Sequence, residues 1–130
     1  MRLAGDPPSP WEEAHGFCRL VRAGGLIVTA GTTSVDAAGV VLGQTPYEQA
    51  AEILRKLERE LHRVGASLAD VIQTRVYVTD VSRAAEVGRA HREAFGEHPP
   101  AMTLVEVAGL VDPRMLVEIE ALALHPDAPA

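Results

Sequence analysis

Two carboxylates lie close together in the last apolar segment of the chain, Leu116–Leu122, which has the sequence Leu-Val-Glu-Ile-Glu-Ala-Leu. If this segment is a strand, alternation puts Glu118 and Glu120 on one face, about 7 Å apart. A carboxylate in so apolar a strand needs a partner or water, because burying an unpaired charge is costly. One interpretation is a hydrated seam or a pair with an arginine at a subunit contact. The other is a carboxylate that orients or deprotonates a water molecule in a cleft.

The other reactive residue types form no catalytic pattern. The glycines lack the spacing of phosphate-binding loops, and no nucleophile elbow is present. Cys18 is the only cysteine, so an internal disulfide is impossible, and we expect a small buried residue there. No metal site is predicted, because no two histidines are four residues apart. The histidines are His15, His62, His91, His98 and His125.

Composition is typical of one soluble globular domain. The 130 residues are 47% hydrophobic and 23% charged, which predicts a single domain over 1–130 with an ordered core at about 15–124. A net charge of −6 and few aromatic residues argue against nucleic acid as a partner. No apolar run is long enough to span a membrane, and the N-terminus lacks a signal-peptide pattern. We therefore expect a soluble, cytoplasmic protein with no membrane partner.

The carboxylate pair must be positioned by a mixture of strands and helices. Thr45, Pro46 and Glu48 form an N-terminal capping signal, an apolar stripe follows at helical spacing, and Gly65 ends the helix. A second helix is predicted from Asp80 or Ser82 to Phe95. The first ten residues and the tail from 125 to 130 are expected to be extended arms. Strands are predicted at 17–23, 26–30, 70–78, 101–108 and 115–124, with a brief one at 40–42.

These elements predict an α+β fold. The strands at 17–23 and 26–30 flank Gly24-Gly25 and form a hairpin, and those at 101–108 and 115–124 are expected to form another. The sheet would be mostly antiparallel, with five to six strands and both helices on one face. The second face also carries valine and leucine but has no helix to cover it. We expect another subunit to bury that face.

Four segments in register resemble the RidA/YjgF family of reactive-intermediate deaminases, also labelled the endoribonuclease L-PSP family. They are 16–31, 65–80, 95–101 and 117–121, so the likeness covers about residues 15 to 124. The resemblance implies a chorismate-mutase-like two-layer sandwich and a homotrimer with small-molecule clefts between subunits. It also implies hydrolysis of 2-imino acids to 2-keto acids and ammonia without a metal or organic cofactor.

The family's site residues carry over only in part. By this resemblance, Glu118 matches the glutamate that positions the attacking water, and Gly31 matches a backbone-donor glycine. Phe17 stands where a tyrosine is usual, and Ala30 where a serine is usual. Met102 replaces the arginine that clamps the substrate carboxylate, and methionine cannot hold a carboxylate. The chain thus resembles an arginine-lacking branch of the family, with a substrate unlike the usual 2-imino acids.

Two other arginines are candidates to compensate for Met102. Arg19 is two residues from Phe17 on the predicted strand and would share its face, and Arg75 lies mid-strand among apolar residues. Each has an alternative interpretation, as an interface residue or the partner of a glutamate. His91 is expected on a helix surface.

Three functional hypotheses follow. The leading one is an imine or enamine deaminase-like hydrolase that uses Glu118. The second is a non-catalytic trimer that binds small metabolites in the same cleft. The third is an endoribonuclease or translation inhibitor, which the net charge and the scarcity of aromatic residues disfavour.

Overall fold

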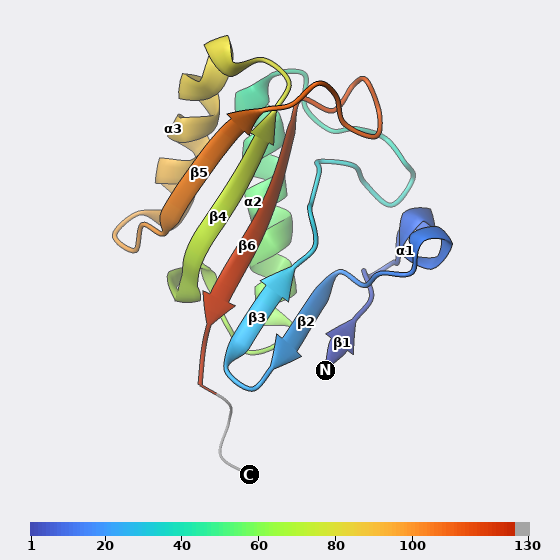
Figure 1. Cartoon of the computed structure of the whole chain (residues 1–130), viewed down its shortest axis with the longest axis vertical. Helices are drawn as coiled ribbons and strands as arrows, with labels where there is room; N and C mark the ends of the chain where they lie inside the picture. The colour runs from blue at the N-terminus through green and yellow to red at the C-terminus, as the bar shows by residue number, and fades with distance from the viewer. Residues whose placement is uncertain (127–130) are drawn as a thin grey trace.

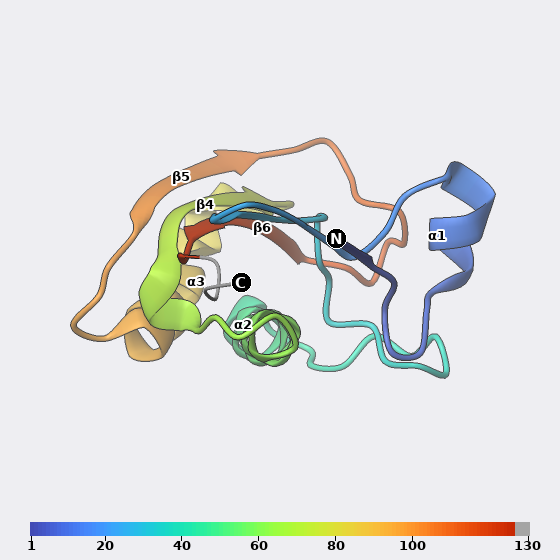
Figure 2. The ribbon, with the colours of Figure 1, turned by 90° about the horizontal axis from the view of Figure 1, so that it is seen from below.

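The computed structural model describes residues 1–126 and has two layers, a six-stranded sheet with two long helices packed on one face (Figures 1 and 2). The end of the expected C-terminal arm, 127–130, lies outside the described residues. In chain order the elements are β1 (Arg2–Leu3), α1 (Pro10–His15), β2 (Leu20–Ala23), β3 (Leu26–Thr29), α2 (Pro46–His62), the 3₁₀ turn η1 (Leu68–Asp70), β4 (Val71–Val78), the 3₁₀ turn η2 (Val81–Arg83), α3 (Ala84–Phe95), β5 (Ala101–Glu106) and β6 (Val117–Leu124).

The sheet has the order β1-β2-β3-β6-β4-β5, and every neighbouring pair is antiparallel except β4 and β5. The predicted α+β class with both long helices on one face is confirmed, as is the first hairpin. The second predicted hairpin is wrong, because β6 pairs with β3 and β4 rather than with β5. The crossover through α3 makes β5 run parallel to β4 at the sheet edge, which leaves the central position to the apolar strand β6.

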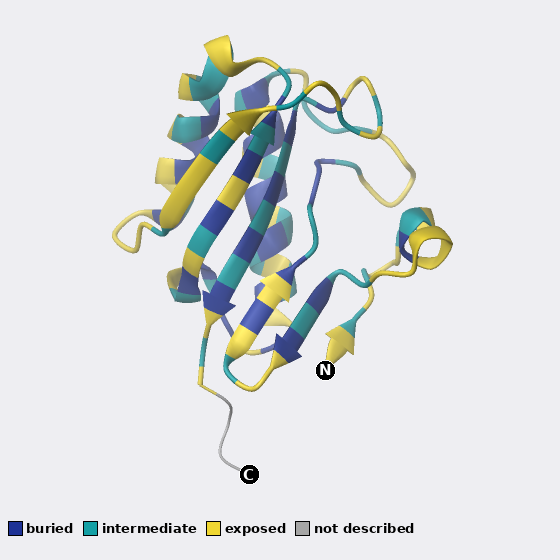
Figure 3. Cartoon of the chain, viewed as in Figure 1, coloured by how far each residue is buried: buried dark blue, intermediate teal, exposed yellow. Residues whose placement is uncertain are grey.

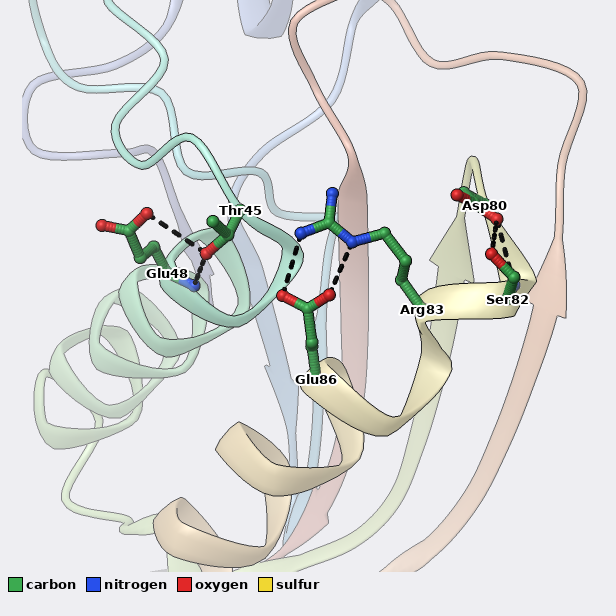
Figure 4. Close-up of polar contacts among 6 residues, drawn as sticks. All are labelled: Thr45, Glu48, Asp80, Ser82, Arg83 and Glu86. Carbon is green, nitrogen blue, oxygen red and sulfur yellow. Dashed lines mark hydrogen bonds and ion pairs between the residues drawn. The ribbon is translucent and has the colours of Figure 1, made fainter.

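Helix α2 begins and ends close to the predicted positions. The Thr45 Oγ1 accepts a hydrogen bond from the Glu48 N–H at 3.1 Å, and Pro46 occupies the first turn, where its missing N–H costs nothing (Figure 4). After Arg63 the chain turns at Gly65, whose φ of +80° favours glycine. The predicted apolar stripe is buried against the sheet and α3, and its members are Ala50, Ile53, Leu54, Leu57 and Leu61.

The second predicted helix begins as the 3₁₀ turn η2 and becomes α-helical only at Ala84. Asp80 caps this turn, because its carboxylate accepts hydrogen bonds from the Ser82 N–H at 3.0 Å and the Ser82 hydroxyl at 2.6 Å (Figure 4). Arg83 and Glu86 pair across the junction at 2.5 Å. The predicted start of this helical segment is therefore confirmed. The structure differs from the prediction only in the first turn, which is 3₁₀ rather than α-helical.

The N-terminal segment is not the extended arm predicted from its prolines. Residues 2–3 form β1 against β2, and residues 10–15 form α1. The Glu12 carboxylate organises this segment, since it accepts hydrogen bonds from the Gly5 N–H at 2.8 Å and the Ser9 N–H at 2.6 Å. Two other strand predictions differ from the structure. The strand predicted at 17–23 starts only at Leu20, and residues 40–42 form a single bridge rather than a strand.

Buried residues alternate with less buried ones along the central strands β4 and β6 (Figure 3), so one face of the sheet is more buried than the other. Alternate residues of each central strand point toward α2 and α3 and are buried, such as Ile119 of β6 and Val76 of β4. The opposite face, which we call the open face, carries exposed apolar side chains of which Leu26, Val28 and Val105 are examples. Within residues 1–126 no helix is both long and apolar enough to cross a membrane.

Candidate functional site

A cavity of about 870 Å³ lies where the N-terminal segment, the 31–42 loop and one side of α2 come together. Its walls include apolar side chains such as Trp11 and Leu42, and its interior carries charged groups from several elements. The charged groups that matter below are Arg19, Lys56 and Glu118. A space of this size with apolar walls and a few charged groups is typical of a small-molecule site.

Glu118 lies at this cavity beside Gly31. The carboxylate is so close to the glycine that a Cβ added there would lie 2.9 Å from the Glu118 Cδ. Burial raises the pKa of Glu118 above its usual value, Arg19 opposes this shift, and Glu120 adds to it. A carboxylate in this environment is a stronger base than an exposed one, which suits proton abstraction from a bound water.

Arg19, which directly precedes β2, also lines the cavity. Its Nη2 donates a hydrogen bond to the Gly31 carbonyl at 2.8 Å, and its guanidinium lies 5.6 Å from the centre of the Phe17 ring. Arg19 and Gly31 are thus joined by a hydrogen bond, and Gly31 contacts Glu118. The fold therefore brings together four of the predicted site residues, Phe17, Arg19, Gly31 and Glu118, which all line the cavity.

Glu120 is on the same face of β6 as Glu118, as alternation predicts, but it does not line this cavity. It accepts a hydrogen bond from the Tyr77 hydroxyl at 2.5 Å and lies 3.7 Å from Arg75. Arg75 is paired with Glu120 in the β4–β6 register and is also outside the cavity. Both residues therefore belong to a polar cluster on the open face of the sheet.

Met102 does not line the cavity either. It lies on the edge strand β5 opposite Thr74 of β4, and paired residues of parallel strands point to the same face. Thr74 is fully buried under α3, so Met102 belongs to the helix-facing row, where its place at the edge leaves it 43% exposed.

The expectation that His91 lies on a helix surface is wrong. His91 is buried beneath α3, its Nε2 forms a hydrogen bond with the Thr74 Oγ1 at 2.8 Å, and its ring packs on Phe95. Burial lowers the pKa of His91, which keeps the ring neutral in this position. Its role in the structure is to connect α3 to β4.

Sequence reasoning missed Lys56 as a cavity residue. Lys56 is the only lysine of the chain, and its Nζ donates to the backbone carbonyls of Thr33 at 2.5 Å and Val35 at 2.8 Å. The sequence shows only that Lys56 lies off the apolar stripe of α2. This position fits a cavity residue and a solvent-exposed lysine equally well. The N-terminal segment, including Trp11 and Glu12, was also missed. Its signal was the capping pattern of Ser9, Pro10 and Glu12, which matches the one that begins α2.

Comparison with known proteins places this geometry in a family. The family model described as Endoribonuclease L-PSP matches residues 9–125. An uncharacterized protein of Streptomyces coelicolor is 37% identical over 115 residues, which are 88% of this chain and 86% of that one. A 2-iminobutanoate/2-iminopropanoate deaminase of Salmonella typhimurium is 30% identical over 108 residues, covering 81% of this chain and 84% of that one.

Among solved structures, a Mycobacterium tuberculosis member of the YjgF/YER057c/UK114 family superposes with a TM-score of 0.85 at 44% identity, covering 95% of this chain and 98% of that one. Fold and cavity together define a small α+β protein of the kind found in that family. The chain belongs to the RidA/YjgF family, as the sequence resemblance indicated.

Proposed function

We propose that this protein hydrolyses a reactive imine or enamine to a carbonyl compound and ammonia, with Glu118 as the residue that positions and deprotonates the attacking water. The observation that carries the proposal is the cavity-facing Glu118 carboxylate, whose pKa is raised by burial and which lies against Gly31. The name of the Salmonella typhimurium relative, a 2-iminobutanoate/2-iminopropanoate deaminase, supports the same reaction class.

The proposed reaction begins with a protonated imine in the cavity. The water oxygen bonds to the imine carbon while the Glu118 carboxylate accepts a proton from that water, which gives a carbinolamine. The protonated Glu118 then returns the proton to the nitrogen. The carbon–nitrogen bond breaks and ammonia leaves, while the hydroxyl gives its proton to the Glu118 carboxylate as the carbonyl forms. Ammonia then takes this proton from Glu118 and leaves as ammonium. No redox partner is needed, because imine and carbonyl carbons have the same oxidation level.

The substrate would differ from the usual 2-imino acids of the family. Met102 carries no charge and lies outside the cavity, so it supplies no clamp for a carboxylate there. We also propose a homotrimer, because the open face carries apolar side chains that a second copy would bury. In this trimer, neighbouring subunits would supply the remaining walls of the cleft, as the family resemblance suggests.

The reaction is tested by releasing imines from amino acids with an amino-acid oxidase and trapping the remainder with semicarbazide. The wild type should divert imine to keto acid before the trap reacts. Glu118→Gln should lower this rate by roughly 100-fold or more, the size typical of losing a general base. Glu120→Gln is the matched control on the same strand face, and it should retain the rate near neutral pH.

Other results would favour the alternatives. A wild type inactive on every imine but able to bind carboxylates saturably would favour the non-catalytic binder, and the uncharged Met102 is the observation that keeps this alternative open. An undiminished rate in Glu118→Gln would exclude the proposed role of that residue. Ribonuclease activity that persists through repurification would support the third hypothesis, which a net charge of −6 disfavours.

A further inference from the structure

Several charged side chains at the cavity already have partners in the chain. Glu52 pairs with Arg55 at 2.5 Å, and Glu60 pairs with Arg63 at 2.6 Å. Glu12 is occupied by the backbone N–H groups of the N-terminal segment. These groups are therefore poor candidates for holding a ligand, and attention falls on the charges without an opposite partner.

Arg19 and Lys56 are two half-buried cations whose hydrogen bonds all go to backbone carbonyls. Arg19 donates through Nη2 to Gly31, while its Nε is buried with no hydrogen-bond partner in the described chain. Lys56 uses two of its three N–H donors on Thr33 and Val35. Among residues 1–126, no carboxylate forms an ion pair with either cation, so each retains a free donor.

The two cations donate to backbone carbonyls two residues apart, Gly31 and Thr33. Burial and then the charge of Arg19 lower the pKa of Lys56 to about 8. Two like charges held in a low-dielectric cavity are relieved by an anion that binds to both, and a carboxylate suits a guanidinium and an ammonium as hydrogen-bond donors. Glu118 lines the same cavity and lies against Gly31, whose carbonyl accepts the hydrogen bond from Arg19.

We propose that Arg19 and Lys56 together bind the carboxylate of the substrate, replacing the cation that Met102 lacks, and that the remaining cavity takes a bulky apolar side chain. This inference rests on the proposed hydrolase and adds its substrate class, an imino acid with a larger apolar group. The apolar part would pack against Trp11, Val35 and Met115, which line the rest of the cavity. The volume of about 870 Å³ exceeds what a three- or four-carbon imino acid would fill.

Lys56 gives the proposal a pH signature. Four charged side chains act on the pKa of Lys56. Arg19 comes from the segment before β2, and Glu52, Arg59 and Glu60 come from the same helix as Lys56. Glu12, Asp36 and Glu118 are the cavity carboxylates of other elements, and His15 also lines the wall. The Cys18 thiol, next to Arg19, is a further ionisable group near the site. A change in carboxylate affinity between pH 7.5 and 9.5 is therefore assigned to Lys56 by its loss in Lys56→Arg.

The experiment measures binding of 4-methyl-2-oxopentanoate by calorimetry between pH 6.5 and 9.5, with the uncharged 4-methyl-2-pentanone as comparison. We expect wild-type affinity for the acid to fall above pH 8, approaching tenfold per pH unit, and the ketone to bind much more weakly. Lys56→Arg should keep the affinity but lose this pH dependence. Lys56→Gln and Arg19→Gln should weaken binding at pH 7 by roughly 10- to 100-fold.

Arg92→Gln is the control, because Arg92 is exposed on α3 and does not line the cavity. It should bind the acid like the wild type. The proposal is overturned if the acid does not bind, if wild-type affinity is independent of pH above 7.5, or if the Arg19 and Lys56 variants bind unchanged. If the glutamine variants fail to fold, the pH profile of Lys56→Arg compared with that of the wild type decides this.

The two proposals fail in distinguishable ways. Binding with the expected pH profile, together with no imine hydrolysis, would refute the hydrolase and leave the carboxylate site standing. Hydrolysis that depends on Glu118, together with acid binding that is unchanged in the Arg19 and Lys56 variants, would refute the carboxylate site alone.

Discussion

Gly31 lies so close to Glu118 that the identity of this residue controls where the carboxylate can lie. A Cβ added at Gly31 would be 2.9 Å from the Glu118 Cδ and 3.1 Å from its Oε2, while the Gly31 backbone needs no left-handed φ. Gly31→Ala should therefore push the carboxylate aside without straining the backbone. We expect imine hydrolysis to fall by about tenfold or more, because small displacements of a catalytic group are costly.

The measurement is steady-state hydrolysis alongside the urea unfolding midpoint. Gly88→Ala provides the control, since a Cβ at this position in α3 would contact nothing within 4 Å. That variant should keep full activity and gain up to about 1 kcal/mol of stability from helix propensity. Full activity in Gly31→Ala would show that the carboxylate position is not critical.

The ionisation of Glu118 should set the acid limb of the activity profile. The water can be deprotonated only by the carboxylate form, so kcat/KM should rise with pH through a pKa above the usual 4.5. Because Glu120 raises this pKa and Arg19 lowers it, Glu120→Gln should move the limb to lower pH and Arg19→Gln to higher pH. This assignment would be contradicted if neither substitution moved the acid limb, or if both moved it in the same direction.

Among the elements, α3 and β4 are joined by a buried pair that makes stability depend on pH. Burial lowers the pKa of His91, so below pH 6.5 the unfolded chain binds a proton that the folded chain does not. Stability should be constant above about pH 7 and fall as the pH drops below 6.5, by at most about 1.4 kcal/mol per pH unit from this residue.

Urea unfolding at fixed protein concentration between pH 5.5 and 7.5 measures this effect. His91→Gln should remove this part of the pH dependence, whereas His98→Gln, at an exposed position after α3, should leave it in place. Identical pH profiles for the wild type and the His91 variant would contradict the assignment of the effect to the pair with Thr74.

Element prediction succeeded where the determining contacts are local. The capping residues and apolar stripe of α2 are set by residues within one or two turns, and the start and end of that helix came out as predicted. The N-terminal arm prediction was wrong because residues 2–3 pair with β2, a long-range contact. The following helix α1 was not predicted, although Ser9, Pro10 and Glu12 form a local capping pattern. The second hairpin failed because strand order is a long-range property: β6 lies between β3 and β4.

For the whole molecule, the open face of the sheet leads to a prediction about assembly. Val28 and Leu26 of β3 are each 41% exposed there, beside Leu124 of β6. Monomeric proteins rarely leave such a patch uncovered, and the family resemblance predicts a trimer. Light scattering of the wild type should give three times the chain mass of 13.9 kDa.

Val28→Asp should lower this mass toward that of the monomer, because the proposed interface cannot accommodate an unpaired charge. Val81→Asp is the control, since Val81 is 50% exposed on η2 rather than on the sheet. A wild type that scatters as a monomer, or a Val28 variant that remains a trimer, would argue against assembly through this face.

The sequence by itself determined the fold class, the family and the common face of Glu118 and Glu120, because caps, helical stripes and strand alternation depend on near neighbours. Only the tertiary structure separated the two glutamates, placing Glu118 at the cavity and Glu120 with Arg75 and Tyr77. It also placed Arg19 and Lys56 at one cavity, although they are 37 positions apart in the chain. Such a meeting depends on how distant elements pack, because Arg19 directly precedes β2 and Lys56 lies on α2.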